Sequence, residues 1–143
     1  MSSEQGFWDV VDGIRESDPR FRREAYGFLM AALGVTVQAL PSERLDDPER
    51  RHLSGRELLA GMARLAREQF GVLAPTVFRE WGITSGEDVG DMVFQLVRAG
   101  QLSARPEDTL DDFRGFDLER ELVTELPTRK APATGEPDRT PRA

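Results

Sequence analysis

The sequence predicts a mainly α-helical, compact domain of about five helices, and three observations support this fold class. Apolar residues recur three and four residues apart through most of the chain. Residues that cap helices precede these stretches, and glycines follow them. The C-terminal half has the helix order of a winged helix, in which a small hairpin or loop follows the last long helix.

Two helices are predicted in the N-terminal third of the chain. Residues 7–14 place apolar side chains at positions i, i+3, i+4 and i+7. A longer helix over residues 18–40 is predicted to start at the motif DPRF. Asp18 can accept hydrogen bonds from free backbone N–H groups there, and the proline fits the first helical position. Gly27 and Gly34 lie on nearly one face of this helix, where we expect another helix to pack closely.

A capping box gives the clearest helix signal in the chain, and it follows a polar loop with two prolines at residues 41–52. Ser54 and Glu57 have the spacing at which each side chain bonds the backbone N–H of the other. They predict the start of a helix over residues 54–70, which Gly71 ends as a C-terminal cap.

Two more helices are predicted before the pattern changes. Residues 74–81 are opened by a proline and closed by a glycine. Residues 85–99 follow, with Thr84 or Ser85 as the N-terminal cap and Gly100 at the C-terminal end.

The last part of the chain is predicted to be irregular. Residues 101–113 hold a proline-led turn between two short segments, which predicts either a hairpin or a loop. Residues 117–126 are expected to form one more short helix. We therefore expect a single domain over residues 1–126 and a disordered, proline-rich tail over residues 127–143.

Composition excludes several classes of function. The net charge is −7, so the chain as a whole repels nucleic acids and anionic membranes. The absence of cysteine excludes disulfides, thiolate zinc sites and cysteine nucleophiles. The start of the chain does not have the pattern of a signal peptide, and no apolar run approaches the roughly 18 residues of a membrane span. We expect a cytoplasmic protein with no membrane partner.

The segment 80–102 resembles the recognition half of a helix-turn-helix, but its charges argue against DNA binding. The N-terminal half of its long helix carries Glu87, Asp88 and Asp91, where a DNA reader presents cationic or amide side chains. Residues 84–119 contain nine acids and three bases, a net of −6. Because phosphate contacts supply much of the affinity for DNA, we expect this acidic face to prefer a basic or neutral protein surface.

No catalytic or cofactor motif is present, so we assign no catalytic residue and expect no cofactor and no metal. The single histidine, His52, is interpreted as a capping or surface residue. A cluster of acids around the predicted turn could bind a hard cation, although solvated acids are the simpler interpretation. The cluster consists of Glu107, Asp108, Asp111, Asp112 and Asp117.

Three functions follow from these features. The first is a non-enzymatic protein-interaction module, either an adaptor or a regulator, whose contacts are aromatics and acids beside the turn; core packing is the alternative for Trp81. The second is a nucleic-acid- or ribosome-associated regulatory factor that uses arginines of the N-terminal half, and the third is an enzyme with an unrecognised site. The candidate partner contacts are Trp81, Phe113, Phe116, Asp111 and Asp112, and the candidate basic patch is Arg20, Arg22, Arg23, Arg50 and Arg51.

Three segments in this order resemble a small family of conserved hypothetical proteins from planctomycetes and verrucomicrobia. They are DPRFRREAYGFLMAAL, RHLSGRELLAGMARLAREQFG and VFREWGITSGEDVGDMVFQLVRAGQLSARPEDTLDDF. The resemblance extends over about residues 7–122 and does not include the proline-rich tail. It implies no activity, because the family has no assigned one, and no site residue is carried over.

Overall fold

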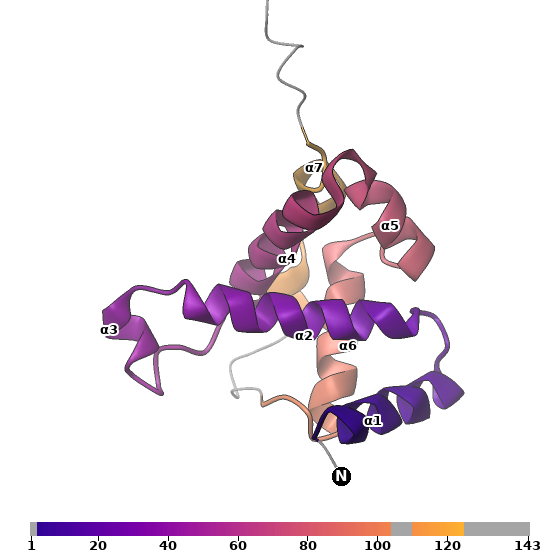
Figure 1. The fold of residues 1–143 in the computed structure, drawn as a ribbon, viewed down its shortest axis with the longest axis horizontal. Helices are drawn as coiled ribbons and strands as arrows, with labels where there is room; N and C mark the ends of the chain where they lie inside the picture. The colour runs from indigo at the N-terminus through magenta and orange to yellow at the C-terminus, as the bar shows by residue number, and fades with distance from the viewer. Residues whose placement is uncertain (1–2, 104–109, 125–143) are drawn as a thin grey trace, which may run out of the picture.

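Helices account for most of the chain in the computed structural model, which describes residues 3–103 and 110–124 (Figure 1). No residue in these two ranges lies in a strand, so the predicted mainly α fold class is confirmed. The α-helices are α1 (Ser3–Ser17), α2 (Arg23–Gln38), α3 (Ser42–Leu45), α4 (Gly55–Phe70), α5 (Ala74–Trp81), α6 (Gly86–Arg98) and α7 (Leu118–Glu121). Two 3₁₀ turns, η1 (Gly71–Leu73) and η2 (Leu110–Phe113), complete the set of described helical elements.

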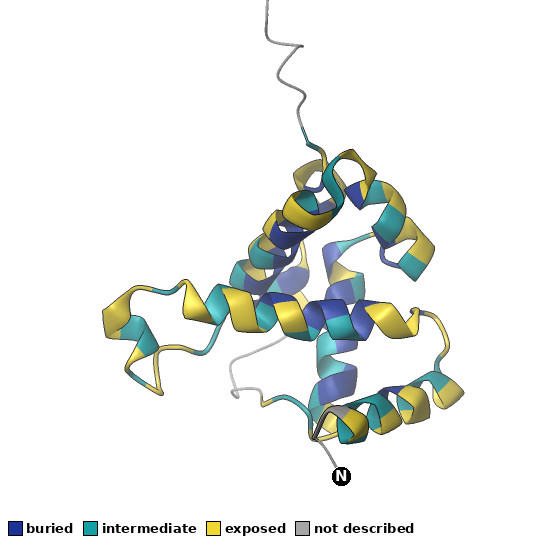
Figure 2. Cartoon of the chain, viewed as in Figure 1, coloured by how far each residue is buried: buried dark blue, intermediate teal, exposed yellow. Residues whose placement is uncertain are grey.

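One hydrophobic core joins α1, α2, α4, α5, α6, η2 and α7. α2 crosses α4 and α6, and it packs most extensively against α4 (Figure 1). Buried residues are concentrated where α2 crosses the other two helices (Figure 2). Tyr26 and Leu29 of α2, Met62 of α4 and Met92 of α6 are all inaccessible to solvent. The apolar stripes predicted from the spacing therefore meet in a single layer between α2 and the two helices behind it.

The predicted caps at the starts of α4 and α6 and at the end of α5 are present. The backbone N–H of Glu57 donates to the Ser54 hydroxyl over 3.1 Å, and the Ser54 N–H donates to the Glu57 carboxylate over 2.9 Å. Of the two candidate caps of α6, Ser85 is the N-cap, and Asp88 completes a second capping box. Gly82 ends α5 with a φ of 92°, a left-handed conformation that favours glycine.

The prediction that α2 begins at the DPRF motif is wrong. The Asp18 carboxylate accepts a hydrogen bond from the backbone N–H of Arg20 over 3.2 Å, which closes a tight turn and does not cap a helix. This turn carries Phe21 into the core, where its ring is inaccessible to solvent, and α2 begins only at Arg23. Burial of an aromatic ring stabilises the turn more than the local capping signal stabilises an earlier helix start.

The segment after α6 contains a 3₁₀ turn where a hairpin would have its second strand. Residues 110–113 form η2, so in the described part of the segment the hairpin alternative is not confirmed and the winged-helix order stays a prediction. Residues 104–109 and the predicted tail, residues 127–143, lie outside the described residues. α7 is the predicted last short helix, reduced to Leu118–Glu121.

Three glycines form a slot that receives η2 between α4 and α6. A Cβ atom on Gly86 would lie 2.5 Å from the Phe113 carbonyl oxygen, and one on Gly90 would lie 2.9 Å from the Phe113 ring. A Cβ atom on Gly55 would lie 2.8 Å from the Cβ of Asp112. Real Cβ atoms do not approach other heavy atoms this closely. The side chain of Phe113 and the backbone of η2 therefore occupy space that only glycine leaves open.

The expected close packing at Gly27 and Gly34 is correct for the first and wrong for the second. A Cβ atom on Gly27 would lie 2.8 Å from the Trp8 ring of α1, whereas a Cβ atom on Gly34 would meet nothing within 4 Å. Gly34 is exposed because α1 packs only beside the N-terminal part of α2 (Figure 1).

We predict opposite effects on stability for two glycine-to-alanine substitutions. Gly86→Ala should lower the free energy of unfolding by about 1–3 kcal/mol, because the new methyl group forces η2 out of the slot. Gly34→Ala should raise it by about 0.5–1 kcal/mol, because the site is open and alanine favours a helix. Urea unfolding of both variants and the wild type measures the difference. Equal stability of the two variants would refute the close approach at Gly86.

Candidate functional site

A cavity of about 320 Å³ lies among four parts of the chain. These are the C-terminal half of α2, the loop before α4 together with the first turns of α4, the middle of α6, and η2. Its walls are largely apolar, and no single element could form them alone. The apolar lining includes Leu33 and Val37 of α2, Leu58 of α4, Val93 and Phe94 of α6, and Phe113 of η2. We call this hollow the α2–α6 cavity. Its volume and lining are typical of a pre-formed binding site.

Three residues that can carry charge stand at the α2–α6 cavity. Arg51 and His52 come from the loop before α4, and Asp112 comes from η2. Within the described part of the chain, the Arg51 guanidinium and the Asp112 carboxylate form no ion pair or hydrogen bond, either with each other or with another residue. Arg51 is exposed and Asp112 is partly buried. The cavity therefore combines apolar walls with one cation and one anion that have no side-chain partner among the described residues.

Arg44 of α3 holds the loop that carries Arg51 and His52. Its guanidinium donates to the Arg50 carbonyl oxygen over 2.8 Å and to the Glu57 carboxylate over 2.6 Å. The hydrogen bond from Arg44 is the main cause that lowers the pKa of Glu57, and the capping bond from the Ser54 backbone adds to it. The predicted polar loop is thus fixed to the first turn of α4. Sequence reasoning missed Arg44, although a capping-box carboxylate keeps an oxygen free for a second donor.

The aromatic residues predicted to be exposed partner contacts pack inward, which corrects that prediction. Phe113 is only 5% exposed, because its ring fills the glycine slot. Trp81 packs its ring against those of Phe28, Phe70 and Phe78 at centroid distances of 5.3–5.8 Å, which is the core-packing alternative. Phe116 is half-buried against the core. Of these three, Phe113 still lines the α2–α6 cavity.

The structure separates the two acids that were predicted as partner contacts. Asp111 forms an exposed ion pair with Arg114 over 2.9 Å. Asp112, the next residue, lines the α2–α6 cavity instead. Successive residues of a helical turn point in different directions, so only one of the two acids can contribute to the cavity.

The five arginines of the predicted basic patch do not come together. Arg20, Arg22 and Arg23 lie where α1 meets α2, whereas Arg50 and Arg51 follow α3 at the other end of α2 (Figure 1). The 16 residues of α2 span about 24 Å at the rise of an α-helix. The prediction of one patch is therefore wrong, because α2 separates the two groups of arginines.

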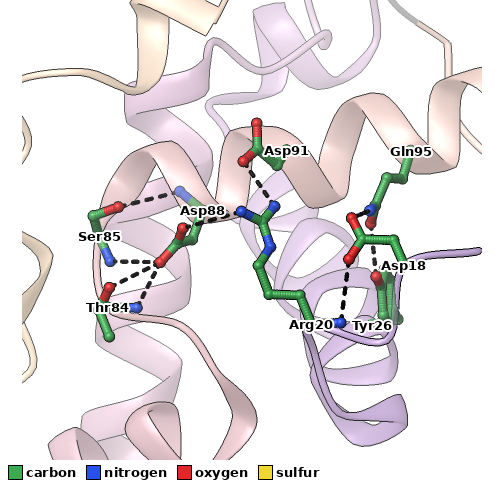
Figure 3. A network of polar contacts seen from close by, with 8 residues as sticks. All are labelled: Asp18, Arg20, Tyr26, Thr84, Ser85, Asp88, Asp91 and Gln95. Carbon is green, nitrogen blue, oxygen red and sulfur yellow. Dashed lines mark hydrogen bonds and ion pairs between the residues drawn. The ribbon is translucent and has the colours of Figure 1, made fainter. Parts of the chain in front are cut away.

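The first three arginines of that set are also neutralised by acids. Arg22 lies 3.9 Å from Glu24, and Arg23 lies 2.8 Å from Asp12. Arg20 donates to Asp91 over 2.8 Å (Figure 3). Exposed pairs of this kind contribute little stability, but they do remove the local positive charge that a nucleic acid would meet.

The acidic N-terminal half of α6 is partly compensated by the same arginine. Arg20 reaches Asp91 and also lies 4.0 Å from Asp88 (Figure 3). Asp88 accepts further hydrogen bonds from the backbone N–H groups of Thr84 and Ser85. Two of the three acids that argue against DNA binding are thus engaged within the protein. Adding up charges by segment overstates the acidity of this face.

A chain of hydrogen bonds, buried at Tyr26 and Gln95 and partly buried at Asp18, joins α6 to α2 and to the turn before it. The Tyr26 hydroxyl donates to the Gln95 side-chain oxygen over 2.6 Å, and the Gln95 amide donates to the Asp18 carboxylate over 3.0 Å (Figure 3). Gln95 is the buried polar residue of the described core. Burial, followed by the negative charge of Asp18, raises the pKa of Tyr26 to about 12 from its ordinary value of 10.0. This chain positions α6, and with it two residues of the cavity wall.

The described residues show neither a metal-ligating cluster nor a membrane-spanning helix. The described residues contain no group of three or more histidine, aspartate or glutamate side chains that could hold a metal ion. Glu107 and Asp108 of the predicted acidic cluster lie outside the described residues. In the part of the chain that the structure describes, no helix combines the length and apolar character needed to cross a membrane.

The chain matches no protein-family model, no curated protein and no solved structure. The resemblance to the planctomycete and verrucomicrobial family therefore stays a prediction.

Tyr26 provides a test of the buried chain, since it is the only tyrosine. Its pKa is raised in the folded protein, so its contribution to stability is complete below pH 10 and is lost as the pH rises through about 12. The ultraviolet absorbance of tyrosinate should have its midpoint near pH 12 in the folded protein and near 10 in urea. Equal midpoints would contradict the burial of the phenol. Tyr26→Phe should lower the free energy of unfolding by about 1–3 kcal/mol at neutral pH.

Proposed function

We propose that the protein is a non-enzymatic, cytoplasmic protein-interaction module that receives an apolar side chain of a partner in the α2–α6 cavity. The observation that carries this proposal is the cavity itself, with about 320 Å³ of space lined by apolar side chains. The strongest contacts of protein interfaces are formed by large side chains that fill pockets of this kind. The free energy of binding becomes more favourable when such a side chain displaces water from an apolar cavity.

The walls of the cavity favour a pre-formed site. α2, α4 and α6 supply most of the lining, η2 is seated in the glycine slot, and Arg44 fixes the loop that carries Arg51. Binding of a partner then costs little conformational entropy, because these walls are already ordered. The proposal does not use Trp81, Phe116 or Asp111, which lie away from the cavity lining.

The geometry supports the two alternatives less well. For an RNA- or ribosome-associated factor, the arginines are split between the two ends of α2, and those at its N-terminal end are paired with acids. For an enzyme, His52 does line the α2–α6 cavity, but Asp112 is the only carboxylate among its described lining residues. Acid–base catalysis commonly relies on several groups held in mutual contact, and His52 and Asp112 are the only acid–base candidates among the described lining residues.

We expect a cavity-filling substitution to abolish partner binding. Val37 lines the cavity and is not part of the hydrophobic core, so Val37→Trp should fill the space without unfolding the domain. The matched control is Val35→Trp on the same helix, because Val35 is 55% exposed and does not line the cavity. Tagged wild type and both variants are cross-linked in cells of the source organism, and the captured proteins are identified by mass spectrometry.

A specific partner should be retained by the wild type and by Val35→Trp and be lost with Val37→Trp. With the purified partner, calorimetry should then show binding to Val37→Trp weakened at least tenfold, about 1.4 kcal/mol. Circular dichroism and thermal unfolding establish that both variants are folded. If Val37→Trp retains the same partners with the same affinity as the wild type, the proposed function is overturned.

A second expectation separates protein binding from nucleic-acid binding. Total RNA and double-stranded DNA should migrate unchanged in a gel-shift assay with the full-length protein, even at low salt. The physical reason is the net charge of −7 together with the paired arginines near α2, which leave few cations to release counterions from phosphates. Retardation that disappears as salt is added would favour the RNA- or ribosome-associated alternative.

A further inference from the structure

The charges at the α2–α6 cavity restrict the chemistry of the segment that enters it. Arg51 and Asp112 both line the cavity, and neither has a partner among the described residues. By contrast, Arg20, Arg23 and Arg44 all have carboxylate partners within 3 Å. Both charges belong to the cavity lining, so a segment bound in the cavity would meet both of them.

Covering an unpaired charge with apolar atoms costs free energy, because the charge loses its hydration and gains nothing in return. A bound segment avoids this cost if it brings an opposite charge to each residue. An acidic side chain can form a bidentate pair with the guanidinium of Arg51, and a basic side chain can pair with Asp112. A segment whose flanking charges have the wrong sign would be repelled by both Arg51 and Asp112.

We propose that the partner segment carries a large apolar anchor residue flanked by an acidic residue on one side, which meets Arg51, and by a basic residue on the other, which meets Asp112. This inference rests on the proposed function and specifies its partner. The apolar anchor supplies affinity through burial. The two charges fix the direction in which the segment lies and exclude sequences with the reverse order.

The chain offers a matched control for each charged residue. Arg50 precedes Arg51 in the same loop and is also exposed, but it does not line the cavity. Asp111 precedes Asp112 and pairs with Arg114 away from the cavity. Four variants follow: Arg51→Glu and Asp112→Asn alter the cavity charges, and Arg50→Glu and Asp111→Asn alter their neighbours.

The experiment selects binding peptides from a random phage-displayed library on the full-length protein and on each variant. Peptides selected by the wild type should share a large apolar residue with an acid on one side and a base on the other. Peptides selected on Arg51→Glu should carry a base in place of the acid. Peptides selected on Asp112→Asn should show no preference for a base. Arg50→Glu and Asp111→Asn should select the wild-type pattern.

A charge exchange on one synthetic peptide completes the test. Arg51→Glu should weaken the binding of a wild-type peptide at least tenfold, and replacing the acid of the peptide with lysine should restore it. A structural role for Arg51 could not produce this rescue. One outcome would overturn the inference and leave the proposed function standing. In that outcome the selected peptides share the apolar residue and lose binding to Val37→Trp, but they show no preference for charged residues. If no selected peptide is blocked by Val37→Trp, the proposed function fails as well.

Discussion

The close approach of η2 to α4 and α6 is the constraint on which the rest of the site depends. It exists because Gly55, Gly86 and Gly90 have no side chains, so that Phe113 and the backbone beside it occupy the space that Cβ atoms would fill. Protein interiors are packed as densely as organic crystals, and a displacement of one wall is transmitted to its neighbours. The seated η2 places Phe113 and Asp112 at the α2–α6 cavity. Three glycines thus determine both the wall of the cavity and the position of its negative charge.

The polar interactions have two different roles, which burial distinguishes. The chain from Tyr26 through Gln95 to Asp18 is largely removed from water, so each of its hydrogen bonds must be made for α6 to keep its place. The pairs of Arg20 and Arg23 are exposed and add little to stability. Their effect is on the surface, because they neutralise the N-terminal end of α2. Arg51 and Asp112 differ from other unpaired surface charges because they line the α2–α6 cavity.

A cavity with apolar walls and two uncompensated charges combines affinity with selectivity. Its volume is suited to one large side chain or a few small ones, and filling it releases water from apolar surface. The charges add little net affinity once their desolvation is counted, but they exclude segments of the wrong polarity. Many protein interfaces are built in the same way: a buried anchor residue supplies most of the binding free energy, and the polar rim supplies the specificity.

The sequence by itself determined the fold class and the ends of α4, α5 and α6. The capping boxes at Ser54 and Ser85 and the terminal glycines lie within a few residues of the groups that they satisfy, so local spacing was enough to locate them. Only the tertiary structure decided that the DPRF motif forms a turn, that Phe113 is buried and that Arg51 and Asp112 meet at one cavity. These features depend on contacts between residues that are far apart in the chain, such as Arg20 and Asp91. Composition and periodicity report which side of a helix is buried, but not which helix covers it.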